Sequence, residues 1–175
     1  MNEKLENALL EKYPLMFEGY TQGFACGDGW YYLIDTLCGS ITVDIEQKKR
    51  DVAFHQKMLD EQNRSDWTPY MHEIWTPEKL IPKIEAYEQS KKIRVAQVKE
   101  KFGGLRFYVD NSTKEQNIKI AFAEDMSYRI CEDCGTMENV MRYPLGWVRS
   151  LCNKHANSAY GKNKAEKYRN EQKCL

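Results

Sequence analysis

The sequence has no excess of charge of either sign, because 26 lysines and arginines balance 26 aspartates and glutamates. A neutral chain produces no overall field that would draw it to nucleic acid or to an anionic membrane. The sequence also has no apolar run near the roughly 18 residues that a membrane-spanning helix needs. Its first turns carry Glu and Lys throughout, unlike the apolar core of a secretory signal. We therefore expect a cytoplasmic protein with no membrane partner.

The sequence also lacks the setting of a disulfide framework, although it contains six cysteines. It shows no export signal, and a chain of 175 residues can build a core without covalent staples. Three of the cysteines instead cluster around one histidine. We therefore expect a reducing compartment in which thiolates bind a metal ion.

Two pairs of metal-ligating residues stand in the C-terminal third of the chain. Cys131 and Cys134 form a C-x2-C pair, and after seventeen residues Cys152 and His155 form a C-x2-H pair. Such pairs supply the four ligands of a tetrahedral zinc ion, with Zn–S of about 2.3 Å and Zn–N of about 2.0–2.1 Å. Gly135 allows the backbone to turn so that its amides point at the thiolates. We predict one zinc ion here, since four unrelated residues would need both spacings by accident.

The ligand set predicts a structural metal site and no enzyme. A catalytic zinc ion normally keeps one coordination position open for water and has three protein ligands. Here four ligands are available, and the three thiolates among them reduce the Lewis acidity of the metal. His72 and Glu73 lack the second histidine of a zinc-protease helix. We expect His55 to be a surface residue, and we expect no catalytic residue and no further cofactor.

The apolar pattern predicts an α+β fold of helices packed with a β-hairpin. Apolar residues recur at spacings of three and four from Trp30 to Ile45, which is typical of a helix. Asp28 is a candidate cap for this helix. Around Gly103 and Gly104 the residues alternate as in a hairpin. The sequence predicts helices at 3–13, 30–63, 78–89 and 114–130, a loop at 64–77 and the hairpin at 92–110.

Two of these helices carry specific expectations about packing. We expect residues 46–63 to form a polar, solvated extension that packs weakly. In the helix at 114–130, four apolar residues are predicted to face the core: Ile118, Ala121, Phe122 and Met126.

The C-terminal region is predicted to resemble a treble-clef zinc finger. Two short β-like runs, at 139–142 and 147–149, lie between the ligand pairs, and a helix follows the second pair. We expect one domain over 1–175, with a zinc-finger subregion at about 128–160.

Charge is distributed unevenly along the chain. Residues 146–175 hold seven basic and two acidic residues, which gives +5 there and −5 in the remainder. The basic helix could follow nucleic-acid phosphates, although a solvated tail explains it equally well. Eleven tyrosines and four tryptophans include residue types that anchor protein interfaces. Acidic residues on the predicted helices could face a basic partner: Glu3, Glu6, Glu11, Glu18, Glu85 and Glu88.

Four segments together resemble a family of small zinc-ligand proteins encoded by phages and prophages. The segments are ACGDGWYYLIDTLC, QVKEKFGGLRFYVD, ICEDCG and GWVRSLCNKH, and the resemblance covers 25–45 and 97–155. The matching ligand positions are Cys131, Cys134, Cys152 and His155. Small phage proteins of this kind include zinc-containing anti-CRISPR proteins that bind Cas9.

The resemblance implies a non-catalytic phage accessory protein in the cytoplasm of a bacterial host. Its expected partner is a host defence nuclease, with Cas9 as the single best candidate. The alternative is a nucleic-acid-binding zinc-finger module, or a zinc-supported nuclease, that contacts nucleic acid through the basic tail.

Overall fold

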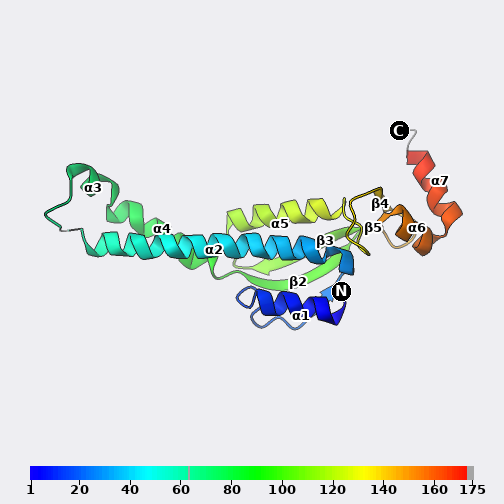
Figure 1. Ribbon diagram of the computed structural model, residues 1–175, viewed down its shortest axis with the longest axis horizontal. Helices are drawn as coiled ribbons and strands as arrows, with labels where there is room; N and C mark the ends of the chain where they lie inside the picture. The colour runs from blue at the N-terminus through cyan, green and yellow to red at the C-terminus, as the bar shows by residue number, and fades with distance from the viewer. Residues whose placement is uncertain (63, 173–175) are drawn as a thin grey trace.

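The computed structural model describes residues 1–62 and 64–172 and shows an elongated α+β molecule (Figure 1). A central body lies between an arm, residues 46–90, and a C-terminal module, residues 131–172. Each part has its own cluster of buried apolar side chains. The α+β prediction is confirmed, whereas the single-domain assignment stays a prediction. Within the described residues, no helix is long and apolar enough to cross a membrane.

The body contains a three-stranded sheet with the order β1-β2-β3. Strand β2 (Arg94–Lys101) pairs antiparallel with β3 (Gly104–Asp110), as the sequence predicts, and the short β1 (Phe24–Ala25) runs parallel to β2. The tight turn is formed by Phe102 and Gly103, both with positive φ (54° and 80°), as in a type I′ hairpin. The turn therefore lies one residue earlier than the glycine pair suggests.

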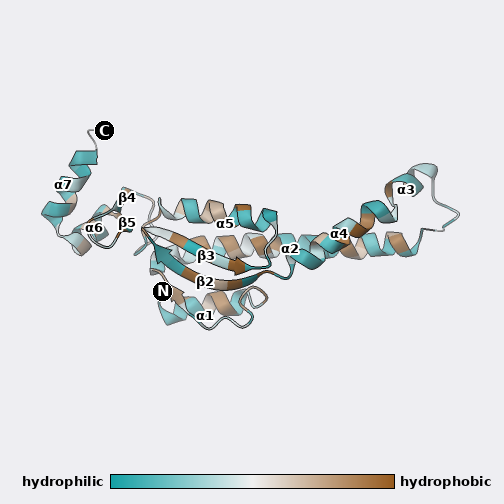
Figure 2. Cartoon of the chain, turned by 180° about the vertical axis from the view of Figure 1, so that it is seen from behind, coloured by the Kyte–Doolittle hydropathy of each residue, from teal (hydrophilic) through white to brown (hydrophobic). Residues whose placement is uncertain are grey.

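The helices cover one face of this sheet and leave the other face open. Seen from behind, β2 and β3 lie in front of α2 with no element over them (Figure 2). Val98 and Phe107 form a register pair that is buried in the core. In the register pairs on either side of this one, the side chains point to the opposite face of the sheet, because successive side chains of a strand alternate between the two faces. Lys99, Arg106 and Tyr108 therefore share the open face.

The covering helices are α1 (Glu3–Lys12), α2 (Tyr31–Asp60) and α5 (Lys114–Ser127). The first helix begins at Asn2, whose side chain accepts a hydrogen bond from the Leu5 N–H at 3.0 Å. The core prediction for the first half of α2 is confirmed at the buried residues that follow: Trp30, Ile34, Leu37, Cys38, Ile41 and Ile45.

Helix α2 begins differently from the sequence prediction. A 3-10 turn, η1 (Asp28–Trp30), precedes it, and Asp28 caps no amide of the helix. Instead, its carboxylate accepts hydrogen bonds from the backbone N–H and side-chain amide of Asn2, both at 2.7 Å. The prediction of Asp28 as an N-cap is therefore wrong, because the residue ties the start of the chain to the body.

The predicted inward face of α5 is also wrong. Ile118 is 70% exposed and Phe122 is 67% exposed, while Ala121 is exposed and Met126 half-buried. The buried positions of α5 are Gln116, Ile120, Ala123 and Ser127.

The reason is that α5 lies along β3, the edge strand of the sheet. The Ser127 hydroxyl accepts a hydrogen bond from the Leu105 N–H, and the Glu124 carboxylate accepts one from the Phe107 N–H, each at 2.8 Å. Unpaired strand N–H groups need such acceptors when they are covered. The face of α5 with the polar acceptors therefore turns inward, and the more apolar face stays outside.

The arm is more ordered than the sequence predicts. The second half of α2 packs against α4 (Pro77–Ser90). The predicted loop contains a short helix, α3 (Pro69–Ile74), whose cap Thr68 accepts a hydrogen bond from the Met71 N–H at 3.3 Å. The expectation of weak packing is wrong, because the arm has its own buried cluster of Met58, Trp67 and Leu80.

The C-terminal module has the predicted order of knuckle, hairpin and helix. Strands β4 (Val140–Tyr143) and β5 (Arg149–Cys152) pair antiparallel. The second of them starts two residues later than the sequence predicts. The single helix expected after them is split into α6 (Asn153–Tyr160) and α7 (Lys162–Gln172). The break is at Gly161, whose φ of +81° is incompatible with a continuous right-handed helix.

Candidate metal centre

The structure brings together all four residues that the sequence predicts as metal ligands. Cys131 and Cys134 lie on the knuckle before β4, Cys152 ends β5, and His155 lies in the first turn of α6. Their ligand atoms all lie within 4.8 Å of one another. The group could therefore hold one metal ion at its centre.

Individual separations within the group are consistent with a shared ion. The Sγ atoms of Cys134 and Cys152 are 4.0 Å apart. The His155 Nδ1 atom lies 3.2 Å from the Cys152 Sγ and 3.4 Å from the Cys131 Sγ. The imidazole therefore approaches both sulfurs through the same nitrogen.

Local backbone geometry prepares the sulfurs for a cation. Burial acts to raise the pKa of Cys152, but hydrogen bonds from the His155 N–H, from the Cys131 and Cys134 side chains and from the Lys154 N–H together outweigh it and lower that pKa. Burial raises the pKa of Cys131 to about 11. A thiol of this kind gives up its proton at neutral pH when a metal ion takes its place, so metal binding and proton release are coupled.

The knuckle is held against the body by the GDGW segment. The Gly29 N–H donates a hydrogen bond to the Glu132 carbonyl at 2.8 Å, and the Trp30 indole donates one to the Ile130 carbonyl at 3.1 Å. A Cβ atom added at Gly29 would lie 2.2 Å from the Cys131 carbonyl oxygen. At Gly27 it would lie 2.3 Å from the Glu132 carbonyl oxygen. Only glycine fits at these two positions.

The sequence predicts a capping role for Asp28 in this segment and does not predict the contact with the knuckle. The segment does precede α2, but its glycines are required by the approach of a knuckle about a hundred residues away in the chain, as the spacing of Trp30 and Ile130 shows. The sequence contains both the GDGW and the CEDCG segments, but nothing in either segment indicates that they meet.

A buried ion pair supports the same junction. The Arg149 guanidinium binds the Glu132 carboxylate at 3.1 Å and also contacts Asp133. Burial raises the pKa of Glu132, an effect that the positive charge of Arg149 opposes. The Ser150 hydroxyl donates a hydrogen bond to the Gly103 carbonyl at 2.6 Å. The C-terminal module therefore contacts the body at both the GDGW segment and the hairpin turn.

His72 and the remaining described cysteines are not members of the four-ligand group. His72 is in α3, at the far end of the molecule, with its ring 5.3 Å from that of Trp67 (Figure 1). Cys38 is buried in the body core, as the sequence predicts. Burial raises the pKa of Cys26 to about 12, so this thiol is protonated at neutral pH. Cys174 lies outside the described residues.

His55 is not the surface residue that the sequence predicts. Its exposed fraction is 9%, and no described group forms a hydrogen bond with its Nδ1 atom. It lies between α2 and α4 in a pocket lined by Lys48, Asp51 and Lys83, among others. The expectation failed because α4 packs on this part of α2, which the sequence predicts to be a weakly packed extension.

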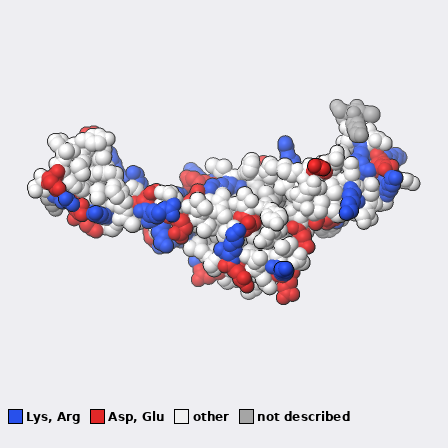
Figure 3. Space-filling view, viewed as in Figure 1, with Lys and Arg blue, Asp and Glu red and all other residues white. Residues whose placement is uncertain are grey.

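The predicted acidic surface is divided between two parts of the molecule. Glu3, Glu6 and Glu11 lie on α1, whereas Glu85 and Glu88 lie on α4 in the arm. Acidic side chains gather along the lower edge in the view of Figure 3, where α1 lies in Figure 1. The six predicted residues therefore do not form one continuous face.

Basic residues of the C-terminal segment are partly used inside the module. Arg149 is held by the acidic pair described above, and Arg169 donates hydrogen bonds to the Tyr143 hydroxyl and the Asn157 side chain. Lys162 lies 4.0 Å from Glu166. Lys173 lies outside the described residues.

Comparison with known proteins yields no match to a family model, a curated protein or a solved structure.

Proposed function

We propose that this protein is a non-catalytic binding protein, stabilised by one zinc ion, that inhibits a host defence nuclease. Cas9 is the first candidate partner. The observation that supports a binding role is an apolar groove between α2 and α5, on the opposite side of the helix layer from the sheet core. The metal centre supports the non-catalytic part of the proposal.

The groove has a volume of about 360 Å³, and its lining is almost entirely apolar. Leu33 and Leu37 of α2 form one wall, and Ile118 and Phe122 of α5 form the other. Single exposed apolar residues are ordinary, whereas a continuous apolar groove is typical of an interaction site. Large side chains in such a groove can supply most of the binding energy.

Zinc is the metal that best suits the donor set. Tetrahedral zinc with ordinary bond lengths places two sulfurs about 3.8 Å apart, and a sulfur and a nitrogen about 3.6 Å apart. The separations in this group, 4.0 Å for one sulfur pair and 3.2–3.4 Å for the sulfur–nitrogen pairs, are close to these values. Four protein ligands fill the coordination sphere, so the ion supplies folding free energy instead of an open site for substrate.

The choice of a nuclease partner rests on the resemblance to small zinc-ligand proteins of phages, a class that includes counter-defence inhibitors. Proteins that handle nucleic acid present basic surfaces, and the acidic edge formed by α1 is complementary to them. Opposite potentials accelerate encounter, while apolar anchors lengthen the lifetime of the complex. In this arrangement, α1 steers the partner and the α2–α5 groove holds it.

The direct test measures target-DNA cleavage by Cas9–guide RNA complexes in the presence of the purified full chain. We expect inhibition near a one-to-one ratio. Phe122→Glu should raise the concentration needed for half-inhibition by about tenfold or more, because it places a charge in the groove. Ile81→Glu is the matched control, because Ile81 is an exposed helical residue in the arm, away from the groove.

Binding must also be shown without DNA, so that sequestration of substrate is not mistaken for inhibition. Co-migration of the protein with Cas9 on size exclusion supports the proposal. Full cleavage together with separate migration removes Cas9 as the partner. Elemental analysis should give about one zinc per chain, and a fully folded protein without metal contradicts the zinc assignment.

A further inference from the structure

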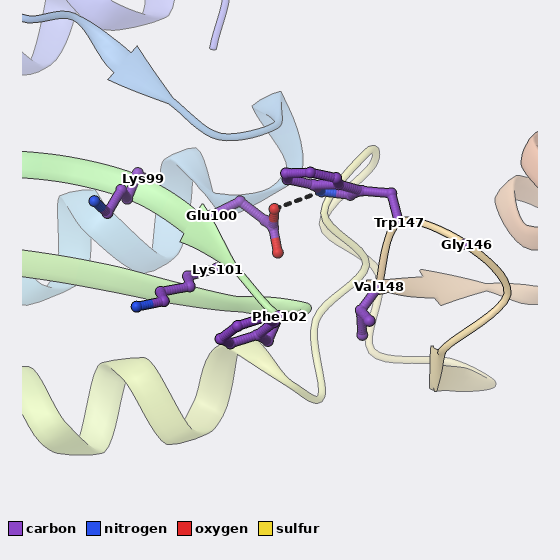
Figure 4. Close-up of a pocket in the computed structure, with 7 residues that line it drawn as sticks. All are labelled: Lys99, Glu100, Lys101, Phe102, Gly146, Trp147 and Val148. Carbon is purple, nitrogen blue, oxygen red and sulfur yellow. Dashed lines mark hydrogen bonds between the residues drawn. The ribbon is translucent and has the colours of Figure 1, made fainter.

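A second surface, distinct from the α2–α5 groove, lies where the hairpin turn of the body meets the C-terminal module. A cleft of about 400 Å³ is lined there by residues 99–102 of the hairpin and 146–148 of the module (Figure 4). It adjoins the open face of β2 and β3. Two aromatic rings and two lysines contribute to its walls, and none of the functions considered so far uses them.

Trp147 presents an exposed ring that is nonetheless held in place. The residue is 73% exposed, while its indole N–H donates a hydrogen bond to the Glu100 carboxylate at 2.7 Å (Figure 4). The other oxygen of that carboxylate accepts a hydrogen bond from the Gly103 N–H at 2.6 Å. The Trp147 carbonyl accepts one from the Tyr160 hydroxyl at 2.6 Å. The ring is therefore a preorganised platform, and the negative charge of Glu100 is engaged by two donors.

Phe102 is an unusual residue for its position. It has a φ of +54° in the turn, a conformation that bulky side chains rarely adopt, and its ring is 61% exposed. Asn or Gly fits such a turn position at lower cost. Backbone strain of this kind is concentrated at functional sites. Neither burial nor turn geometry accounts for a phenylalanine here, whereas contact with a ligand does.

Positive charge lies beside the Phe102 ring and beside the Tyr108 ring of the adjoining open face. The Lys101 Nζ atom is 5.5 Å from the centre of the Phe102 ring, and the Lys99 Nζ atom is 5.3 Å from that of Tyr108 on the open face. The ion pairs of the described residues include neither lysine. The two ammonium groups are therefore available to an anionic ligand.

We propose that this cleft and the adjoining open face of β2 and β3 bind single-stranded nucleic acid, with bases stacked on Trp147 and Phe102 and phosphates paired with Lys99 and Lys101. Exposed aromatic faces beside cations are the combination that recognises unpaired bases on a phosphate backbone. Duplex DNA keeps its bases stacked on one another and cannot offer their faces to these rings. The ligand is therefore a single strand.

The test uses the zinc-loaded full chain and fluorescein-labelled 15-nucleotide strands of one mixed sequence, as DNA, as RNA and as the DNA duplex. We expect anisotropy to report binding of single strands and at least tenfold weaker binding of the duplex. Either single strand supports the proposal, and comparison of the two shows which backbone is preferred. No binding of either at 50 mM salt overturns it, as does equal binding of the duplex.

Two ring variants separate a ligand contact from a structural role. Phe102→Asn removes the ring but suits the turn, so the protein should become as stable or more stable while affinity for the single strand falls. Trp147→Ala should weaken binding by roughly 5- to 150-fold, the range for loss of one stacked base. Tyr70→Ala is the matched control, because it removes an exposed ring from α3 in the arm, away from both binding surfaces. Equal losses in the control and ring variants would contradict the proposed site.

Charge variants distinguish this cleft from the basic C-terminal helices. The double variant Lys99→Gln with Lys101→Gln should reduce the slope of log affinity against log salt by about 1.4, the value for two phosphate contacts on a single strand. Lys162→Gln with Lys164→Gln makes the same charge change on α7 and should leave the slope unchanged. If the α7 pair alone reduces it, the tail binds the strand and the cleft does not.

Tryptophan fluorescence gives an independent signature. Stacking of a base should quench the emission of Trp147, and Trp147→Phe should abolish that quenching while keeping most of the affinity. Quenching that persists in this variant would place the strand elsewhere. These measurements contain no nuclease, so their outcome is independent of the inhibition assay above.

Discussion

The C-terminal module and the arm extend from opposite ends of the body, and different interactions hold them. The module has few large buried apolar side chains, chiefly Tyr143 and Leu151, and its knuckle is bound to the body through backbone hydrogen bonds. The arm continues helix α2 and is closed by apolar packing around Leu80. We therefore expect the module to depend on a bound metal ion, whereas the arm depends on burial of a small apolar cluster.

Removal of the metal should have the largest effect and should be confined to the module. Structural zinc ions contribute about 10–16 kcal/mol in zinc-finger peptides. We expect Cys131→Ser, or incubation with a chelator, to abolish hydrogen-exchange protection in residues 131–172 and to preserve it in α2 and the sheet. Uniform loss of protection along the chain would show that the module and body fold as one unit.

Gly29→Ala should come next, because it pushes the knuckle backbone away from the body while leaving the four candidate ligand side chains unchanged. The added Cβ would lie 2.2 Å from the Cys131 carbonyl, a contact that only a backbone shift can relieve. We expect a loss of about 3–4 kcal/mol in the free energy of unfolding, measured by denaturant titration. Gly39→Ala in α2 is the control, because its Cβ meets only the Tyr13 hydroxyl, at 3.1 Å, and alanine favours the helix. Equal effects of the two would disprove the proposed fit.

Leu80→Ala should loosen the arm and leave the metal site intact. Leu80 is completely buried, and truncation of a buried leucine costs about 2–5 kcal/mol. We expect faster hydrogen exchange in α3 and α4, with unchanged exchange in α6 and unchanged zinc content. A loss of zinc in this variant would mean that the stability of the arm and that of the C-terminal module are coupled through the body.

A change of pH should produce the smallest difference in stability between the arm and the C-terminal module. Burial, together with the nearby charge of Lys83, lowers the pKa of His55, and Asp51 partly opposes this. A histidine whose pKa is lower in the folded state favours folding fully above its unfolded pKa of about 6.5, and it loses this contribution as the pH falls from that value through the lower folded-state pKa. We expect the protection factors of the arm, which are corrected for the intrinsic exchange rate at each pH, to fall as the pH is lowered from 7.5 to 5.5.

His55→Gln is the control for this pH effect, because glutamine cannot acquire the charge. The pH-dependent loss of protection should disappear in the variant. The comparison uses only peptides of α2 and α4, which lie away from the metal ligands. Persistence of the loss would assign it to another titrating group.

Residue spacing in the sequence was sufficient to predict those features that are formed by residues close together in the chain. The hairpin at 92–110 and the C-x2-C and C-x2-H ligand pairs each involve residues close in sequence, and the structure contains all of them. The predictions failed where a distant segment decides the environment. His55 is buried by α4, and α5 turns Phe122 outward because its polar residues satisfy the edge of β3.

The sequence by itself determined the long helices, the hairpin and the identity of the four candidate metal ligands, because periodicity and ligand spacing are properties of short segments. Only the tertiary structure decided that Gly29 must admit the Cys131 carbonyl, and that Phe102 and Trp147 lie beside one cleft. The physical reason is that close approach and shared exposure depend on segments far apart in the chain. No local pattern of side chains specifies which distant backbone will arrive there.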